Sequence, residues 1–273
     1  MGKMNATLAA LVLATGATGP AAEAGSGYPD PFEVAQFRIL PGWRTPEGTH
    51  MAGLHITLAP GWKTYWRAPG DAGIPPELDW SGSRNLAGMS FHWPVPKVFH
   101  QNGLRSIGYS GEVLLPMELV PDGPGAIGLT AELSIGVCED VCMPMHVRLR
   151  ADLPAGARPD PRIGAALRDR PMTEAEAGVV SVRCTVEPID DGLRMRAEIA
   201  MPALSGDEVA VFETADPRIW VSESAVTRQG GALWAETDMV PPNGKPFFLN
   251  RSDVRITVIG GDSAVDIRGC DGG

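Results

Sequence analysis

The residue types that could carry chemistry gather in one short stretch, GVCEDVCMPMH, at residues 136–146. It contains two of the four cysteines of the 273-residue chain, spaced four apart as Cys138 and Cys142. If the intervening residues form a tight loop, the two Cα atoms fall within the ~4.4–6.8 Å that a disulfide requires. A disulfide across so few residues constrains the unfolded chain little and is a poor staple. This favours a pair that opens and closes in thiol–disulfide exchange over a purely structural bridge.

Two acidic residues, Glu139 and Asp140, lie between these cysteines. Negative charge beside a thiol disfavours the thiolate, so we expect the acids to raise the thiol pKa. A strong oxidant needs the opposite environment, because a low thiol pKa stabilises the reduced form. The acids therefore fit a carrier that takes electrons from one dithiol and passes them to another. The alternative is that both side chains point into solvent and have little effect.

The same stretch supplies a second candidate chemistry, the binding of copper. Thiolate, thioether and imidazole ligands suit Cu(I), and the stretch offers Cys138, Cys142, Met143, Met145 and His146. The two methionines flank a proline at the expected entry to a strand, where alternate residues can instead be core. No second cluster of cysteine and histidine occurs in the sequence, which argues against a closed zinc site. Exchange itself needs no metal or cofactor, and a redox-silent adhesion or assembly module is the third possibility.

The remaining cysteines, Cys184 and Cys270, are far apart in the sequence. A bridge that closes so large a loop could contribute ~4 kcal/mol on the chain-entropy model, and it would hold a C-terminus that otherwise frays. We therefore expect a structural disulfide; a second redox couple or a free Cys270 is the alternative. Residues 178–269 contain no histidine, no Ser/His/Asp pattern and no phosphate-binding loop, which predicts a scaffold or docking role.

The start of the chain has the features of a secretory signal peptide. Lys3 supplies a positive charge, residues 6–14 (ATLAALVLA) form an apolar run too short to span a membrane, and residues 22–24 (AEA) fit a cleavage site. We expect residues 1–24 to be removed and the protein to be exported to the periplasm, where an even number of cysteines favours disulfides. The alternative is an N-terminal anchor helix. The formal net charge of −10 argues against nucleic acid as a partner.

The elements that must position the cysteines are predicted to be β-strands. Apolar and polar residues alternate in short runs that are separated by glycine- and proline-rich turns, and a long helical pattern is absent. The clearest runs span residues 50–58, 112–120, 127–137, 147–153, 179–186, 193–199, 208–213 and 254–259. The sequence therefore predicts an all-β protein of two immunoglobulin-like antiparallel sandwiches. The cysteine pair falls at a strand-to-strand connection, unlike the C-x-x-C motif of thioredoxin-type folds.

The composition changes at Pro154, and this predicts two domains. Residues 154–177 are rich in proline, alanine and charge, and they contain one short helix pattern over 161–168 with Asp160 as its N-cap. We interpret this segment as a linker between a first domain at 31–153 and a second at 178–273. Five of the seven tryptophans precede the cysteine pair in the first domain, where we expect the site to lie.

Four segments of the first domain resemble a known family when taken in order. They are GWKTYWRAPGDAGIPPELDWSGS (61–83), FHWPVPKVF (91–99), GYSGEVLLPM (108–117) and GVCEDVCMP (136–144). Together they resemble the amino-terminal periplasmic domain of DsbD-type thiol:disulfide interchange proteins, in particular the suppressor-of-copper-sensitivity branch. The resemblance covers residues 31–153 and extends more loosely into the second domain.

The resemblance implies that Cys138 and Cys142 are the exchanging thiols, with Cys142 forming mixed disulfides. In this family of protein-disulfide reductases, electrons come from a thioredoxin-like partner that is fed by a membrane thiol transporter, and they pass to periplasmic client proteins such as disulfide isomerases. The chain ends at Gly273 without a transporter or a thioredoxin-like domain. We therefore expect the transporter to be a separate protein.

The resemblance also implies residues that support the pair. Tyr65 and Trp66 match aromatic residues packed beside it, whereas Trp80 and Trp93 are expected in the core. Residues 98–103 (VFHQNG), with Phe99 and His100, match a cap loop that covers the disulfide until a partner displaces it. The sequence departs from well-known members in two ways: their cysteines are spaced more widely, and their cap loop carries an acid-acid-Phe-Tyr string. We therefore expect a different set of clients.

Overall fold

The computed structural model of the chain describes Met1 and residues 30–71, 73–101 and 103–272. Residues 31–273 form one compact unit. The predicted signal peptide, apart from Met1, lies outside the described residues, as does Asn102 of the expected cap loop. Within the described residues, no helix is long and apolar enough to cross a membrane.

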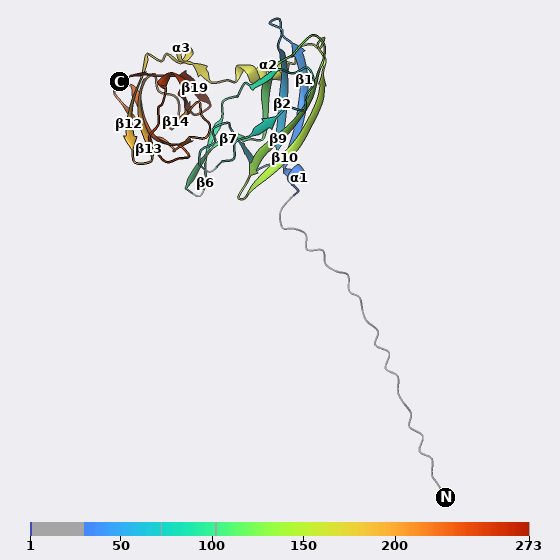
Figure 1. Cartoon of the computed structure of the whole chain (residues 1–273), viewed down its shortest axis with the longest axis horizontal. Coiled ribbons are helices and arrows are strands. Elements are labelled where there is room, and N and C mark those ends of the chain that lie inside the picture. The colour runs from blue at the N-terminus through green and yellow to red at the C-terminus, as the bar shows by residue number, and fades with distance from the viewer. Residues whose placement is uncertain (2–29, 72, 102, 273) are drawn as a thin grey trace. The chain divides into compact units, whose positions relative to one another are not determined.

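Two antiparallel sheets form the first sandwich (Figure 1). The short helix α1 (Pro31–Val34) leads directly into the first strand. One sheet has the order β1-β2-β8-β5, with β1 at Ala35–Arg44, β2 at His50–Leu58, β8 at Glu112–Val120 and β5 at Gly88–Phe91. The other has the order β10-β9-β3-β7-β6, with β10 at Cys142–Leu153, β9 at Ile127–Cys138, β3 at Lys63–Tyr65, β7 at Leu104–Ser110 and β6 at Lys97–Gln101; β4 (Glu77–Asp79) also pairs with β9.

The second sandwich repeats this architecture with its own sheets. One has the order β11-β19-β18-β14, with β11 at Met172–Thr173, β19 at Ser263–Arg268, β18 at Arg255–Gly260 and β14 at Glu208–Glu213. The other has the order β15-β17-β13-β12-β20, with β15 at Trp220–Val221, β17 at Ala232–Val240, β13 at Gly192–Ala200, β12 at Ser181–Ile189 and β20 at Asp271–Gly272; β16 (Ala225–Gln229) pairs with β17. A 3-10 turn, η1 (Arg251–Asp253), precedes β18. The predicted fold class, two immunoglobulin-like sandwiches in an all-β protein, is confirmed.

Strand β9 explains how the core and the cysteine site are connected. Its residues alternate between buried and less buried positions from Ile127 to Ile135, as expected for a strand with one face on the core. Each large apolar side chain buried in this way contributes about 1.5–3 kcal/mol. The last four residues, Ile135 to Cys138, are all buried, so the end of the strand is covered on both faces. The disulfide therefore begins in the interior of the sandwich.

The segment between the sandwiches is folded against them. The helix expected over residues 161–168 is present as α2 (Pro161–Arg168), and the side chain of Asp160 accepts a hydrogen bond from the amide of Arg162 as its N-cap. Ile163 of this helix is fully buried in a small cluster with Leu40 and Met51 of the first sandwich. A second short helix, α3 (Glu174–Ala177), follows β11, which pairs with β19.

Candidate functional site

Cys138 and Cys142 close a tight β-hairpin. Cys138 is the last residue of β9 and Cys142 the first of β10; they are direct register partners with a Cα–Cα distance of 4.2 Å. Their sulfurs form a disulfide across the three turn residues 139–141. Cys138 is only 1% exposed, whereas Cys142 is exposed. An incoming thiolate can therefore approach the bond from the Cys142 side.

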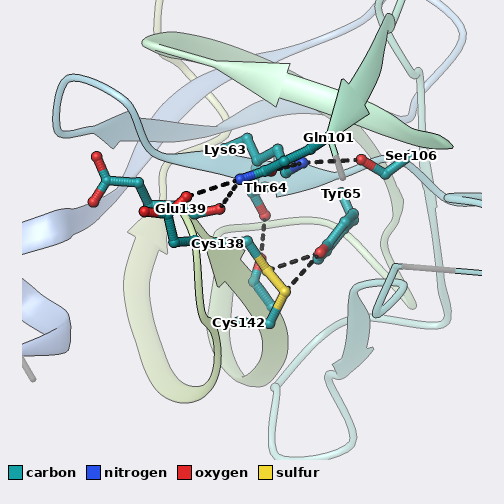
Figure 2. Close-up of a disulfide and its surroundings, with 10 residues drawn as sticks. Lys63, Thr64, Tyr65, Gln101, Ser106, Cys138, Glu139 and Cys142 are labelled. Carbon is teal, nitrogen blue, oxygen red and sulfur yellow. Dashed lines mark hydrogen bonds between the residues drawn. A yellow bond between two sulfur atoms is a disulfide. The ribbon is translucent and has the colours of Figure 1, made fainter. Parts of the chain in front are cut away.

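Tyr65 contacts both sulfurs of this disulfide. Its hydroxyl oxygen lies 2.7 Å from Cys138 Sγ and 3.0 Å from Cys142 Sγ (Figure 2). The side chain is buried, and burial raises the pKa of Tyr65 above its ordinary value. The hydroxyl is thus protonated at neutral pH and can donate a hydrogen bond to a thiolate that forms at either sulfur.

The backbone around Tyr65 brings the phenol to this place. Strand β3 pairs with β9 through Lys63↔Cys138, and the hydroxyl of Thr64 donates to the carbonyl of Gly136 at 2.8 Å. A Cβ added at Gly136 would lie 3.0 Å from the Tyr65 ring, and one at Gly73 would lie 2.9 Å from it. Both glycines thus leave room for the ring to reach the sulfurs.

Gln101 ties the edge strand β6 to the hairpin turn. Its side-chain amide nitrogen donates to the carbonyl of Glu139 at 3.0 Å and to the carboxylate of Asp140 at 3.1 Å. Lys63 Nζ donates to the amide oxygen of Gln101 at 3.0 Å and lies 3.1 Å from the hydroxyl of Ser106 (Figure 2). Burial lowers the pKa of Lys63. Sequence reasoning did not single out Lys63, Ser106 or Gln101, although Gln101 lies inside the expected cap segment.

The expected cap is a strand rather than a loop. Residues 98–101 belong to β6, which pairs with β7 in the hairpin at the edge of the sheet. Phe99 is half-buried with Lys63 Nζ 5.3 Å from its ring centroid, and His100 is exposed. The two residues line a groove of about 510 Å³ together with Trp62, Gln101 and Glu139. The geometry places this edge beside the cysteine turn; its role as a cover stays a prediction.

Both acids of the turn are exposed and engaged away from the sulfurs. The carboxylate of Asp140 accepts its hydrogen bond from Gln101. The carboxylate of Glu139 lies over the backbone of Gly61, where it would be 2.4 Å from an added Cβ, and Figure 2 shows it directed away from the disulfide. This arrangement fits the alternative in which the acids have little direct effect on the thiols.

The five residues considered for copper do not converge. Met145 is buried in the core of the first sandwich and Met143 packs against that core. Cys142 and His146 alternate with them along β10 and are exposed, and His146 Nδ1 lies 3.0 Å from the hydroxyl of Ser134. Among the described residues, no group of three or more His, Cys, Asp or Glu side chains is arranged to hold a metal ion.

Three tryptophans of the first sandwich, Trp66, Trp80 and Trp93, contribute to its core. Trp66 is fully buried in the first sandwich, and the guanidinium carbon of Arg67 lies 3.9 Å from the centroid of its ring. Trp80 and Trp93 pack against the same core and are partly buried. Of the two aromatic residues expected beside the cysteines, Tyr65 is the one whose contact with the sulfurs defines the site.

Cys184 and Cys270 form the second disulfide, within the second sandwich. Cys184 lies in β12 and is fully buried, and Cys270 immediately precedes β20, which pairs with β12. The bond therefore attaches the C-terminal strand to the sheet. This geometry fits the predicted structural role.

The fold and the site define a class of protein: an immunoglobulin-like sandwich that holds a hairpin disulfide against a buried phenol. Residues 33–154 match the family described as thiol:disulfide interchange protein DsbD, N-terminal. The chain is also similar to the crystal structure of the N-terminal periplasmic domain of ScsB from Proteus mirabilis. Sequence identity is 24% over 88% of this chain and 94% of that chain, with a TM-score of 0.68, which shows a shared fold across both sandwiches. No curated protein matches the chain.

Proposed function

We propose that this protein is a periplasmic thiol–disulfide exchange carrier that passes electrons through Cys138 and Cys142. One observation carries the proposal: the hydroxyl of Tyr65 contacts both sulfurs of a disulfide with one buried and one exposed cysteine. A bridge that served only as a staple would need neither a phenol at its sulfurs nor an approach from solvent.

The different exposure of the two cysteines supports the following order of bond changes. A thiolate of a reduced partner attacks Cys142 Sγ, a new partner–Cys142 disulfide forms, and the Cys138–Cys142 bond breaks. The bonding electron pair leaves with Cys138 as a thiolate, which Tyr65 stabilises by donating its hydroxyl hydrogen. A hydrogen bond to a charged group of this kind contributes about 1.5–3 kcal/mol.

A second thiolate of the same partner completes the transfer. It attacks the partner's own sulfur in the mixed disulfide and releases Cys142 as a thiolate, so the partner is oxidised and the pair in this protein is reduced. Cys142 then attacks the disulfide of a client, and Cys138 resolves the new mixed disulfide. Both electrons pass to the client without a metal or cofactor.

The family match supports partners with dithiol chemistry. The name of the family supports thiol:disulfide interchange as the activity, and the periplasmic relative supports that compartment. The electron donor is then a thioredoxin-like protein or domain supplied by a separate membrane thiol transporter, and the clients are periplasmic proteins with disulfides.

Trapping of mixed disulfides tests the proposal. The Cys138→Ser variant keeps the exposed Cys142 but lacks the thiol that resolves a mixed disulfide with a client, so we expect it to accumulate adducts with client proteins in cells. The Cys142→Ser variant keeps only a buried thiol and should trap none, and Cys184→Ala serves as the control for unspecific thiols. Absence of an adduct in the Cys138→Ser variant, or stoichiometric Cu(I) uptake in its place, would refute the exchange function.

A further inference from the structure

The second sandwich contacts the chain segment that follows Tyr65. Arg67 reaches β14, where its Nε and Nη2 donate to the two carboxylate oxygens of Glu213 at 3.0 and 2.9 Å. Nη2 also lies 3.3 Å from the hydroxyl of Thr257 in β18. The side chains of Arg67 and Glu213 are only 12% and 22% exposed. A mostly buried ion pair with two hydrogen bonds fixes the orientation of the guanidinium group as well as its distance from the carboxylate.

Further contacts from the second sandwich hold the same region. The indole nitrogen of Trp220 donates to the carboxylate of Asp71 at 2.8 Å. Arg105, in the strand that pairs with β3, lies 3.4 Å from the carboxylate of Glu223. Apolar side chains of the second sandwich also join the buried cluster of the first, namely Val209, Ile259 and Ala264. The interface between the two sandwiches therefore combines apolar packing with hydrogen bonds and ion pairs.

The held segment returns to the phenol ring. It leaves the site at Tyr65, is anchored at Arg67 and Asp71, and comes back at Gly73 and Ile74. An added Cβ at Gly73 would lie 2.9 Å from one edge of the Tyr65 ring, and Ile74 and the ring both lie close over Gly136. A displacement of Arg67 or Asp71 therefore shifts the residues on either side of them, and these residues hold the Tyr65 ring in place.

We propose that Glu213 is a positioning residue for the exchange reaction: through Arg67 it holds the hydroxyl of Tyr65 at the sulfurs of Cys138 and Cys142. The inference rests on the proposed function and assigns a task to the second sandwich. The physical reason is that a hydrogen bond weakens steeply when its donor moves or tilts. Loosening the anchor leaves the phenol in place on average but reduces the fraction of time that it donates to the Cys138 thiolate.

The test measures how fast dithiothreitol opens the Cys138–Cys142 bond, and the midpoint potential of this pair, in five full-length variants. Tyr65→Phe removes the hydroxyl, Glu213→Gln removes the anchor charge, and the double variant combines them. The matched control is Glu208→Gln, because Glu208 lies in the same strand and pairs with Arg228, whose hydrogen bonds to Glu208, Met201 and Pro202 stay within the second sandwich. Mass spectrometry of alkylated peptides separates this pair from Cys184 and Cys270.

We expect Glu213→Gln to slow opening and to shift the potential in the same direction as Tyr65→Phe, which should slow it about tenfold or more. The double variant should match Tyr65→Phe, and Glu208→Gln should match the wild type. Trp220→Phe, at a half-exposed position, should give a smaller shift in the same direction even if Glu213→Gln fails to fold.

Three results would overturn the inference. They are a wild-type rate and potential in the folded Glu213→Gln variant, an additive loss in the double variant, or an equal shift in Glu208→Gln. A separate measurement tests the exchange function. The absence of a partner adduct on Cys142 would refute that function, and this result does not depend on these rates.

Discussion

The hydroxyl oxygen of Tyr65 lies 2.7 Å from the sulfur of Cys138, although the two residues are 73 positions apart in the sequence. The contact is made in the interior of the first sandwich, where both residues are buried. The hydroxyl oxygen does not improve packing of the core at this position, because a buried polar group needs a hydrogen-bond partner. The two sulfurs lie within hydrogen-bonding distance of this oxygen, and this joins the packing of the sandwich to the chemistry of the disulfide.

The Tyr65→Phe substitution should slow opening of the Cys138–Cys142 bond. The departing Cys138 thiolate loses a hydrogen bond of about 1.5–3 kcal/mol, so the rate with dithiothreitol should fall about ten- to a hundredfold. Since burial raises the pKa of Tyr65 above 10.0, its hydroxyl stays protonated at lower pH. The ratio of wild-type to variant rates should therefore be constant between about pH 6 and about pH 9. Stopped-flow measurement at several pH values checks this, and a ratio that varies with pH would contradict it.

The Gln101→Ala substitution should release the edge strand β6 from the cysteine turn. It removes the amide that bonds both Glu139 and Asp140, and a net loss of about 1 kcal/mol would increase opening of this edge about fivefold. We expect faster hydrogen exchange over residues 98–101 and faster reduction by a small thiol. Lys97→Ala, at an exposed position of the same strand, is the control. Unchanged exchange and reduction in Gln101→Ala would show that the strand does not cover the disulfide.

Removal of the second disulfide should affect stability and not exchange. The Cys184→Ala, Cys270→Ala double variant should lose about 4 kcal/mol of unfolding free energy on the chain-entropy model. Its Cys138–Cys142 pair should react with dithiothreitol at the wild-type rate. In the wild-type chain the same reagent should open the first pair sooner, because Cys142 is exposed, whereas Cys184 is fully buried and Cys270 is partly buried. Equal opening rates for the two bonds would remove the distinction between a reactive and a structural pair.

His50 should make the protein less stable in mild acid. Its imidazole is fully buried and bonded to the carbonyl of Pro41 at 2.6 Å, and burial, assisted by the charge of Arg44, lowers its pKa below the ordinary value of 6.5. The unfolded state then binds a proton more readily than the folded state. The stabilising contribution is therefore present above pH 6.5 and is lost as the pH falls below that value towards the folded pKa.

Thermal unfolding of the wild type and of a His50→Gln variant checks this prediction. Glutamine is uncharged and retains a nitrogen that can donate to Pro41, so the variant should lack the part of the pH dependence that comes from the imidazole. We expect the melting temperature of the wild type to fall more steeply than that of the variant between about pH 7 and about pH 5. Parallel curves would contradict the assignment to His50.

Local patterns were sufficient to predict much of the fold. The strands expected over residues 50–58, 112–120 and 208–213 have those bounds in the structure, because short apolar-rich runs between turn residues are a local signal of strands. The helix at Pro161–Arg168 was also predicted, since its N-cap and periodicity are local. The three-residue strand β3 was not, because GWKTYW does not alternate and its pairing with β7 and β9 is made at long range.

The sequence by itself determined the all-β class, the hairpin position of the cysteine pair and, through the resemblance, Tyr65 as a residue beside it. Only the tertiary structure decided that the phenol touches both sulfurs, that Gln101 holds the turn, and that Glu213 of the other sandwich anchors Arg67. The reason is physical: strand periodicity and caps depend on neighbours in the chain, whereas these contacts depend on how distant strands are paired and packed.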